Sequence, residues 1–356
     1  MTPKQKNLWE GLSMQHEIRE AIPLLDSEGN LTQPGYAKRL LPIYDRSKVK
    51  GGFARLKEWD YYYIGNDRFG VALTIADNSY MGLDSISFLS FGDAPWQITK
   101  SPMRIFPMGK TNLPATSAEG ITEIVGKGYE IHFVVRNRQR VLTAHMDDFK
   151  DGKAINIQIT LGCEPEESIV ICTPFDKPGH FYYNQKNNCM RASGEVSIGD
   201  ERYLFDPSDS FGVLDWGRGV WTYHNTWYWG SASGLVDGVD FGFNIGYGFG
   251  DTSAASENML FYQGKAHKLS QVTFQIPMKN GKEDYLKPWK FTSDDGRFEM
   301  AFTPVLDRAA CTDFKVLKSD QHQVFGRFTG TAVLDDGKRL EIRELMGFAE
   351  KVENKW

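Results

Sequence analysis

The sequence lacks the motifs by which most cofactors and metals are bound. It contains no G-x-x-x-x-G-K-[ST] phosphate loop, no G-x-S-x-G nucleophile elbow and no H-E-x-x-H zinc motif. Gly246, Gly248 and Gly250 have the wrong spacing for a dinucleotide fingerprint, and no helix is expected after them. The seven histidines show no metal-ligand spacing. We therefore expect a site without cofactor or metal, or no site.

Cysteines, long apolar runs and excess charge are scarce as well. The four cysteines form no C-x-x-C pair, and in a chain of 356 residues we expect them to be reduced and buried. No stretch approaches a membrane span, and MTPKQKNLWEGLSMQHEI lacks the apolar core of a signal peptide. A net charge of −5 with interspersed signs implies neither a nucleic-acid nor an anionic-membrane partner. We expect a cytoplasmic protein without an integral membrane segment.

The composition is that of a soluble globular protein, with 41% hydrophobic, 24% charged and 13% aromatic residues. After residue 50, short strand-like segments recur about every 8 to 12 residues, separated by Asp-Gly and related turns, with almost no amphipathic helices. Their number is too large for one small barrel. We predict an all-β fold of two antiparallel barrel-like halves over residues 51–195 and 196–356. An irregular leader over residues 1–50 is expected to wrap on the first barrel.

The stretch of residues 211–258 is where we expect the site to form. Asp237-Gly238 favours a tight hairpin turn, so we predict paired antiparallel strands over 227–235 and 239–249. Along the second strand, apolar residues alternate with glycines, and Asn244 lies on the glycine face. A glycine face lets something approach the backbone closely. A ligand bound by Asn244 and another part of the protein both remain open as interpretations.

Three acids of this stretch are the candidate catalytic residues: Asp215, Asp251 and Glu257. Asp215 stands in an apolar run, where burial would favour its protonated form and suit a proton donor. The alternative is a structural acid that pairs with Arg218 or with backbone amides. Asp251 and Glu257 could instead cap a turn.

Aromatic and polar side chains supply the candidate ligand-binding residues. Four tryptophans of the central stretch could line an apolar cavity or stabilise a developing cation, or could simply belong to the core. Arg218 lies between two glycines, which would let it reach a ligand carboxylate. A second cluster of acids and aromatic residues begins at Glu58. The full set is Trp216, Arg218, Trp221, Trp227, Trp229, Asn244, Asn258, Glu58 and Trp59.

Long motifs of the chain resemble one known family. LDWGRGVW, W-x-W-G-S-A-S-G and FGFNIGYGFGD followed by Glu257-Asn258 are similar to the bacterial proteins grouped as domain of unknown function 2804. PLLDSEGNL-x-x-PGYAK, KEWDYYYI, CTPF, FYYNQKNNCM and MGFAE also resemble that family, so the resemblance covers nearly the whole chain. It implies no established activity.

The chain is also distantly similar to the carotenoid 1,2-hydratase and AttH-like group, which implies tandem lipocalin-like barrels with a ligand site between or within them. That group carries a His-Asp-His-Asn-Trp-Gly run ahead of a W-x-W-G strand. Here the matching run ends in Asp215-Trp216-Gly217, with Asp215 at the Asn position, and both histidines and the acid are missing. The resemblance therefore carries over the scaffold and a few residues, namely Trp216, Gly217, Trp227, Trp229 and Gly230.

Three functions fit these residues, and each has a small molecule as its partner. The first is a cofactor-free enzyme acting on a terpenoid, polyene or fatty-acyl compound, as a hydratase, another lyase or an isomerase. Asp215 would be its general acid, the tryptophans would stabilise positive charge, and Asn244 would orient the substrate or a water. The second is a non-catalytic, lipocalin-like carrier of lipids or other hydrophobes. The third is carbohydrate chemistry by Asp215 paired with Asp251 or Glu257.

Overall fold

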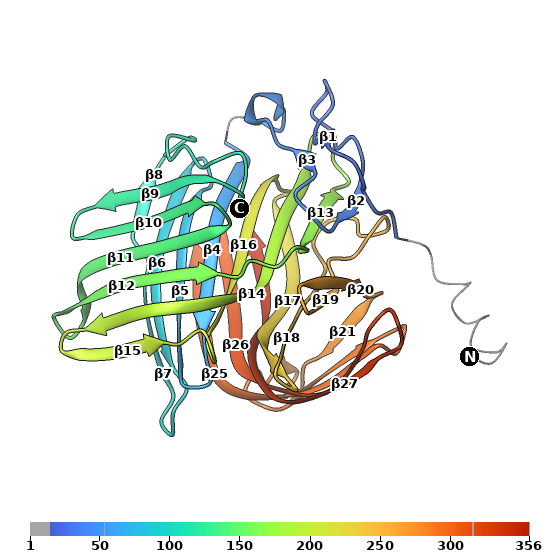
Figure 1. The fold of residues 1–356 in the computed structure, drawn as a ribbon. Helices are drawn as coiled ribbons and strands as arrows, with labels where there is room; N and C mark the ends of the chain where they lie inside the picture. The colour runs from blue at the N-terminus through green and yellow to red at the C-terminus, as the bar shows by residue number, and fades with distance from the viewer. Residues whose placement is uncertain (1–14, 53, 315–316, 356) are drawn as a thin grey trace.

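The computed structural model describes residues 15–52, 54–314 and 317–355, and it consists almost entirely of antiparallel strands (Figure 1). Within these ranges the only helix is the 3-10 turn η1 (Arg46–Lys48), where the Asp45 carboxylate accepts the backbone N–H of Ser47. The predicted all-β fold is confirmed. No helix in the described part of the chain has the length and apolarity needed to span a bilayer.

A sheet of 14 strands forms the first part of the molecule. Its strands are β2 (Gly35–Ala37), β4 (Leu56–Gly65), β5 (Phe69–Asp77), β6 (Met81–Ser90), β7 (Trp96–Lys100), β8 (Met103–Ile105), β9 (Gly120–Gly126), β10 (Tyr129–Arg136), β11 (Gln139–Lys150), β12 (Lys153–Gly162), β13 (Ile169–Pro174), β14 (Phe181–Ile198), β15 (Glu201–Phe205) and β16 (Phe211–Val220). The main path is β7-β6-β5-β4-β16-β14-β12-β11-β10-β9.

A sheet of nine strands forms the second part, in the order β20-β19-β18-β17-β27-β26-β25-β24-β21. Its strands are β17 (His224–Val236), β18 (Val239–Tyr247), β19 (Met259–Tyr262), β20 (Lys265–Lys268), β21 (Val272–Gln275), β24 (Trp289–Ser293), β25 (Phe298–Phe314), β26 (Leu317–Val333) and β27 (Arg339–Lys355). Two small pairs complete the fold: β1 (Ile22–Pro23) with β3 (Pro42–Ile43), and β22 (Met278–Lys279) with β23 (Lys282–Glu283).

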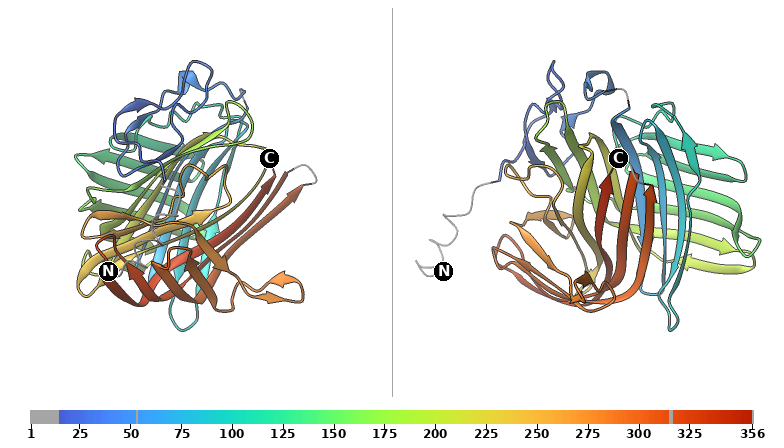
Figure 2. Two further views of the ribbon diagram at one scale, coloured as in Figure 1. Left: turned by 90° about the vertical axis from the view of Figure 1, so that its right-hand side faces the viewer. Right: turned by 180° about the vertical axis from the view of Figure 1, so that it is seen from behind.

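Each sheet curls around its own apolar core, and the two sheets lie side by side (Figure 2). They divide between β16 and β17, whereas we predicted a division near residue 195. That residue lies inside β14, which pairs with β16 from Phe181↔Val220 onward. Because the long ladder of β14 continues the first sheet past residue 195, β16 and Asp215 belong to the first sheet. The separation of the halves into independent domains stays a prediction.

The predicted central hairpin is confirmed. β17 and β18 pair in register from Trp229 to Val236, and the turn residues Asp237 and Gly238 have φ angles of 51° and 77°. Both values are positive, as the two-residue turn with right-handed strand twist requires.

The glycine face of β18 meets protein. A Cβ atom added to Gly242 would lie 2.6 Å from the Cys189 sulfur of β14, and one added to Gly246 would overlap the Glu257 carboxylate. Of the two interpretations left open above, close approach by another part of the protein therefore applies at both positions. The glycines let the two sheets come close together at this point.

Residues 15–50 of the leader are irregular, as predicted, and they contact both sheets, while residues 1–14 of the predicted leader lie outside the described residues. Its strand β2 pairs with β13 of the first sheet, and Leu24 and Leu25 are buried in the first core. The backbone N–H of His16 donates to the Ala254 carbonyl at 2.8 Å, in the segment that follows β18. The leader thus ties the first sheet to the segment before β19.

The four cysteines are all unpaired, but only two are buried as predicted. Cys172 and Cys189 lie on β13 and β14 inside the fold, whereas Cys163 and Cys311 are exposed. The exposed pair falls outside the cores, because Cys163 follows the end of β12 and Cys311 lies near the outer end of β25.

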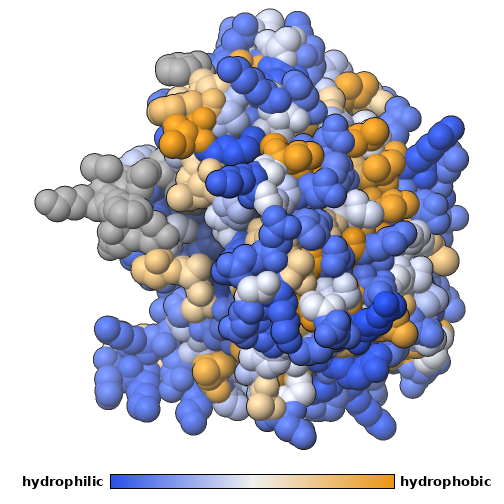
Figure 3. Space-filling view, turned by 90° about the vertical axis from the view of Figure 1, so that its left-hand side faces the viewer, coloured by the Kyte–Doolittle hydropathy of each residue, from blue (hydrophilic) through white to orange (hydrophobic). Residues whose placement is uncertain are grey.

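The surface over the outer strands of the first sheet is mostly hydrophilic and carries separate apolar patches (Figure 3). Exposed apolar side chains of this sheet include Ile105, Ile121 and Val125. Apolar side chains of this kind are common on the surfaces of soluble proteins.

Candidate functional site

A row of side chains from three strands of the first sheet faces the second sheet. On β14, the alternation of faces turns Asn184 and Lys186 toward the interface between the sheets. The register then places Lys186 beside Asp215 of β16, and Asp215 beside Tyr61 of β4. A cation, an acid and a phenol therefore lie next to one another across three strands.

A second row faces it from the other sheet. Gln323 of β26 is opposite Glu350 of β27, and Glu350 is opposite Trp229 of β17. The two rows meet where the Lys186 ammonium lies 4.6 Å from the centroid of the Trp229 ring. The Tyr61 hydroxyl also reaches the Gln323 side chain, at 3.4 Å. We call these facing rows the interface cluster.

Lys186 is the buried centre of the interface cluster. Its ammonium lies 3.5 Å from Asp215 and 3.3 Å from Glu257, and it donates to the Asn184 side chain at 2.9 Å and to the Tyr182 hydroxyl at 3.1 Å. Its side chain is 3% exposed, against 14% for Asp215 and 13% for Glu257. Burial lowers the pKa of Lys186, but attraction to the two carboxylates outweighs burial and raises it. Lys186 is therefore a fixed ammonium ion.

Asp215 is surrounded by N–H donors. The Trp59 indole donates to its Oδ1 at 3.2 Å, and the Asn184 amide and Lys186 ammonium converge on the same atom. The Trp59 ring reaches it by lying across Gly217, where an added Cβ would overlap the ring. Asp215 is therefore placed as a hydrogen-bond acceptor.

Glu350 is the acid of the interface cluster whose pKa is most clearly shifted. It is 8% exposed and accepts the Trp227 indole N–H at 2.9 Å and the Gln323 amide at 3.0 Å. Burial raises the pKa of Glu350 to about 7, and the charge of Asp215 adds to the increase, although the Trp227 hydrogen bond opposes it. A carboxyl group that titrates near neutrality can both donate and accept a proton.

Aromatic rings pack beside the charged groups. Trp59 stacks on Tyr182 with centroids 6.2 Å apart and meets the edge of Trp221 at 5.2 Å. Phe249 contacts Tyr182, Trp221 and Trp227 with centroids 4.8 to 5.3 Å apart. We call these five residues the aromatic cluster. Its π-faces lie close to Asp215 and Glu350, where they suit an apolar or cationic group.

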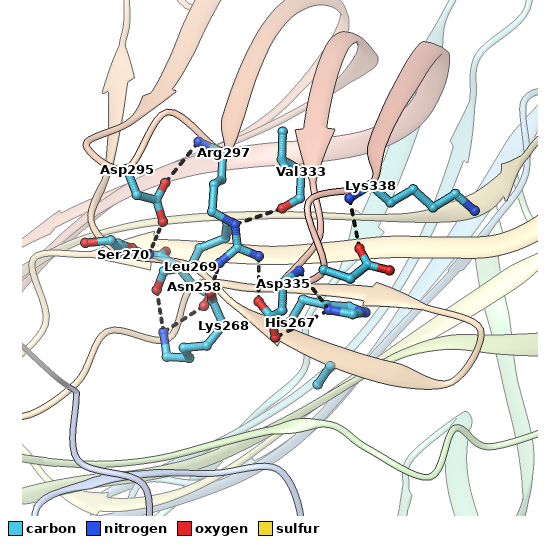
Figure 4. A network of polar contacts seen from close by, with 12 residues as sticks. Asn258, His267, Lys268, Leu269, Ser270, Asp295, Arg297, Val333, Asp335 and Lys338 are labelled. Carbon is cyan, nitrogen blue, oxygen red and sulfur yellow. Dashed lines mark hydrogen bonds and ion pairs between the residues drawn. The ribbon is translucent and has the colours of Figure 1, made fainter. Parts of the chain in front are cut away.

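A polar network on the second sheet holds the segment that carries Glu257 (Figure 4). Asn258 accepts the Gly246 N–H at 2.7 Å and donates to the Ser270 carbonyl at 2.7 Å. The Lys268 ammonium donates to the Asn258 carbonyl at 2.7 Å, and burial lowers the pKa of Lys268 to about 7. These bonds fix the backbone on the C-terminal side of Glu257. The missing side chain of Gly246 leaves room for the Glu257 carboxylate.

Seven predicted site residues lie in or beside the two clusters. Asn244 supports Trp229 by accepting its indole N–H at 2.7 Å, and it donates to the Glu257 carbonyl at 2.8 Å. The other six belong to one of the clusters or contact its charged groups. They are Asp215, Glu257, Trp59, Trp221, Trp227 and Trp229.

Other predicted residues lie elsewhere. Arg218 is three residues from Asp215 and so faces the first core, where it pairs with Asp60 at 3.1 Å and lies 4.2 Å from the Trp216 ring. The sequence suggested that Arg218 pairs with Asp215. In the structure, Arg218 pairs with Asp60 instead. Glu58 faces the same core and pairs with Arg46 and Tyr44.

Asp251 and Asn258 have structural contacts. Asp251 is exposed and accepts the Ser253 backbone N–H at 2.9 Å, which is the turn-capping alternative given above. Asn258 acts on the backbone near Glu257 and does not contact Lys186. Neither lies in the interface cluster.

Several residues of the two clusters were missed from the sequence, and four of them contact the charged groups or rings directly. Lys186 and Tyr182 lie in the FYYNQKNNCM motif, Glu350 ends MGFAE, and Gln323 lies on β26. One signal was available: the residues from Asn184 to Asn188 in FYYNQKNNCM are all polar, within a strand that is buried on both faces. A polar run inside a buried strand indicates that polar groups meet other polar groups there.

Replacing Glu350 by glutamine should make the stability of the folded chain less sensitive to a rise in pH through neutrality. Because the folded-state pKa of Glu350 is raised from 4.5 to about 7, wild-type stability falls as pH rises through this window. The variant cannot ionise, so its free energy of unfolding relative to wild type should increase by about 2–3 kcal/mol between about pH 5 and about pH 8. Urea unfolding at both pH values measures the change.

Glu166→Gln is the control for that measurement. The hydrogen bond and ion pair with Lys265 lower the pKa of Glu166, and the pKa of Lys265 is raised, so Lys265 stays charged at both pH values. Stability from Glu166 is lost only as pH falls below the ordinary glutamate range, so this variant should differ from wild type equally at both pH values. A pH-independent difference for Glu350→Gln would contradict the raised pKa.

Metal binding finds no support in the described residues. No group of three or more His, Cys, Asp or Glu side chains among them is arranged to hold a metal ion.

Three solved structures align with most of the chain at low sequence identity. The protein described as AttH (NE1406) from Nitrosomonas europaea aligns with a TM-score of 0.52 and 11% identity over 85% of this chain and 92% of that one. Kievitone hydratase from Nectria haematococca gives 0.45 and 12% over 94% and 98%. CghA in complex with Sch210972 gives 0.42 and 10% over 93% and 97%. The AttH likeness shows a shared lipocalin-like fold.

The sequence itself matches one family over nearly its whole length. No curated protein matches the chain. The family model of the domain of unknown function DUF2804 covers residues 15–356. Those residues include both sheets, the interface cluster and the aromatic cluster. The chain is therefore a member of the DUF2804 family.

Proposed function

We propose that the chain is a cofactor-independent acid–base enzyme that hydrates or isomerises a double bond in a largely apolar small molecule. The observation that carries this proposal is the position of Glu350. It is a carboxyl group with a pKa of about 7, it belongs to a cluster that includes a fixed ammonium ion, and aromatic rings lie beside it. Such a pKa suits a general acid at neutral pH.

Glu350 takes the role of proton donor that the sequence suggested for Asp215. The protonated Glu350 carboxyl transfers its proton to one carbon of the double bond, and the adjacent carbon becomes cationic. The rings of Trp227 and Trp229 and the Asp215 carboxylate stabilise that charge. In hydration, a water oxygen bonds to the cation and its proton returns to Glu350. In isomerisation, a proton from a neighbouring C–H returns to Glu350.

Lys186 positions other groups in this mechanism and transfers no proton itself. Its ammonium is held by Asp215 and Glu257 with a raised pKa, so it does not supply the neutral amine that imine chemistry needs. It keeps the two carboxylates in place and lowers the net negative charge that Glu350 meets when it ionises.

A non-catalytic carrier is the second candidate, and a separate observation favours it. A cavity of about 260 Å³ opens between the sheets beside Tyr63, Val213 and Phe348, and no residue of the interface cluster lines it. A carrier needs a cavity and no acid. We give the charged cluster more weight, because strongly perturbed acids gather at functional sites more often than at passive ones.

Turnover in D₂O tests the enzyme proposal. Polyenes, terpenoids and unsaturated fatty-acyl compounds are incubated with the protein, and mass spectrometry follows deuterium uptake or addition of solvent. We expect wild type to convert at least one compound and Glu350→Gln to be slower by about 10²- to 10⁴-fold. The wild-type rate should fall as pH rises through about 7, because the donor must be protonated.

Lys351→Met is the matched control, since Lys351 lies next to Glu350 in sequence and pairs with Glu283. It should leave the rate within about twofold of wild type, as expected for a partly exposed pair outside the site. Equal rates for Glu350→Gln and wild type would contradict the mechanism. Binding of these compounds without turnover would favour the carrier.

A further inference from the structure

The cavity of about 260 Å³ lies two residues along the strands from the interface cluster: Tyr63 and Phe348 line it, whereas Tyr61 and Glu350 belong to the cluster. Strands β4, β16, β17 and β27 form most of its walls. A layer of packed side chains that includes Tyr61, Trp229 and Phe325 belongs to the same interface. None of these three side chains lines the cavity. The cavity is thus distinct from the interface cluster.

Tyr63 presents an unsatisfied hydroxyl at this cavity. The residue is 8% exposed, and its ring packs on Phe325 and Phe348 with centroids 5.0 and 5.6 Å apart. Its hydroxyl makes no hydrogen bond with any residue in the described ranges. The Tyr63 hydroxyl is not among the side-chain atoms that are shut off from solvent without a partner, so it is open to the cavity and can donate to a ligand or a water there.

Two glycines allow Tyr63 to take this position. A Cβ atom on Gly65 would overlap the Tyr63 hydroxyl, and one on Gly70 would lie 2.8 Å from the ring and 2.9 Å from the hydroxyl oxygen. Both glycines lie on the hairpin β4–β5, directly opposite each other. The strands therefore lack side chains where the phenol ring needs space.

A β-bulge shapes the opposite wall. The pairing of β26 with β27 shifts register between Phe328 and Gly330, and Glu344 has a φ angle of 51°. The neighbouring residues Arg343 and Leu345 line the cavity together with Glu344. Bulges that redirect the chain occur next to binding sites.

Two of the three acids that line the cavity pair with arginines outside its lining. Asp67 pairs with Arg327 and Asp209 pairs with Arg68, each at 3.4 Å. The remaining charged lining residues are one base and one acid, Arg343 and Glu344. Apolar walls come from Phe211, Val213, Leu345, Met346 and Phe348. This lining favours an uncharged molecule over an ion.

We propose that this cavity is a second small-molecule site, which binds a neutral amphipathic molecule through an oxygen that accepts the Tyr63 hydroxyl. Its volume of about 260 Å³ is close to the lower end of small-molecule pockets, which begin at about 300 Å³. The ligand is therefore a compact ketone, ester or ether with an apolar body. This site is independent of the acid–base chemistry proposed for Glu350.

Fluorine NMR with 4-fluoroacetophenone as the probe tests the proposal. The wild-type chain should broaden the probe signal in a saturable manner. Tyr63→Phe removes only the hydroxyl and should weaken the Kd by about three- to tenfold, the loss expected for one hydrogen bond. Leu235→Trp, at an exposed lining position, should weaken binding by filling the cavity.

Two controls decide where the probe binds. Fluorobenzene lacks the oxygen, so Tyr63→Phe should leave its Kd unchanged. Tyr61→Phe alters the neighbouring phenol of the interface cluster and should leave 4-fluoroacetophenone binding unchanged. Equal Kd values for wild type and Tyr63→Phe would overturn the proposal, as would weakening by Tyr61→Phe alone, which would place the probe at the interface cluster. Absence of saturable binding to a wild type that is folded by circular dichroism would also overturn it.

Discussion

Lys186→Met is expected to lower the free energy of unfolding by about 3–5 kcal/mol at neutral pH. The substitution keeps a side chain of similar length but removes the ammonium between Asp215 and Glu257, which lie 3.5 and 3.3 Å from it. Those carboxylates would then face one another inside the sheet interface, with Glu350 nearby, and the cation between them would be gone. Urea unfolding followed by tryptophan fluorescence measures the loss.

The triple variant Lys186→Met, Asp215→Asn, Glu257→Gln separates charge from packing. It removes the cation and both partner charges, so most of the lost stability should return. Lys351→Met, which breaks a partly exposed pair with Glu283, should cost less than about 1 kcal/mol. If Lys186→Met unfolded at the same urea concentration as wild type, the ammonium would not hold these carboxylates together.

Gly217→Val is expected to cost about 3 kcal/mol, near the upper limit for overpacking in a core. The Cβ of any residue at this position would overlap the Trp59 ring, so the indole must leave its place across β16. Trp59 would then lose its hydrogen bond to Asp215 and its stacking on Tyr182. Near-ultraviolet circular dichroism reports the altered tryptophan environment, and urea unfolding reports the cost.

Two comparisons make this prediction specific. Gly162→Val changes a strand glycine with open space around its Cα and should alter stability by less than about 0.5 kcal/mol. In a double-mutant cycle, Trp59→Ala and Gly217→Val should cost less together than the sum of their separate effects, because both remove the same indole contacts. Additive costs would mean that Gly217 acts through something other than Trp59.

Local patterns of the sequence predicted the fold and part of the site. The Asp237-Gly238 turn and the alternation of β18 are short-range signals, and both strands formed as predicted. Asp215 and Glu257 could be singled out because both lie in the stretch of residues 211–258, which is rich in tryptophan and glycine. Lys186 and Glu350 could not, because each reaches the site through strand register over a long sequence separation: 29 residues from Lys186 to Asp215, and 121 from Trp229 to Glu350.

Arg218 shows a different kind of error. Its two flanking glycines suggested a mobile side chain, and its position three residues after Asp215 suggested a pair. Both residues lie on one strand, where an odd spacing puts them on opposite faces. The alternation rule that placed Asn244 would have separated Arg218 from Asp215 had it been applied to β16. Gly217 makes room for the Trp59 ring. It gives the Arg218 side chain no conformational freedom, because Arg218 is fully buried.

The order of strands in the second sheet has a consequence for folding. β27 lies between β17 and β26, so the central ladder joins His224 to Lys355. Loop-closure entropy must be overcome across this long separation before the middle of the sheet can form, which predicts slow folding. Until then the edge of β17 that receives β27 is unpaired and can join another chain. Glu350 reaches Trp227 and Trp229 only in that late step, so the interface cluster is completed last and the half-folded chain is prone to aggregate.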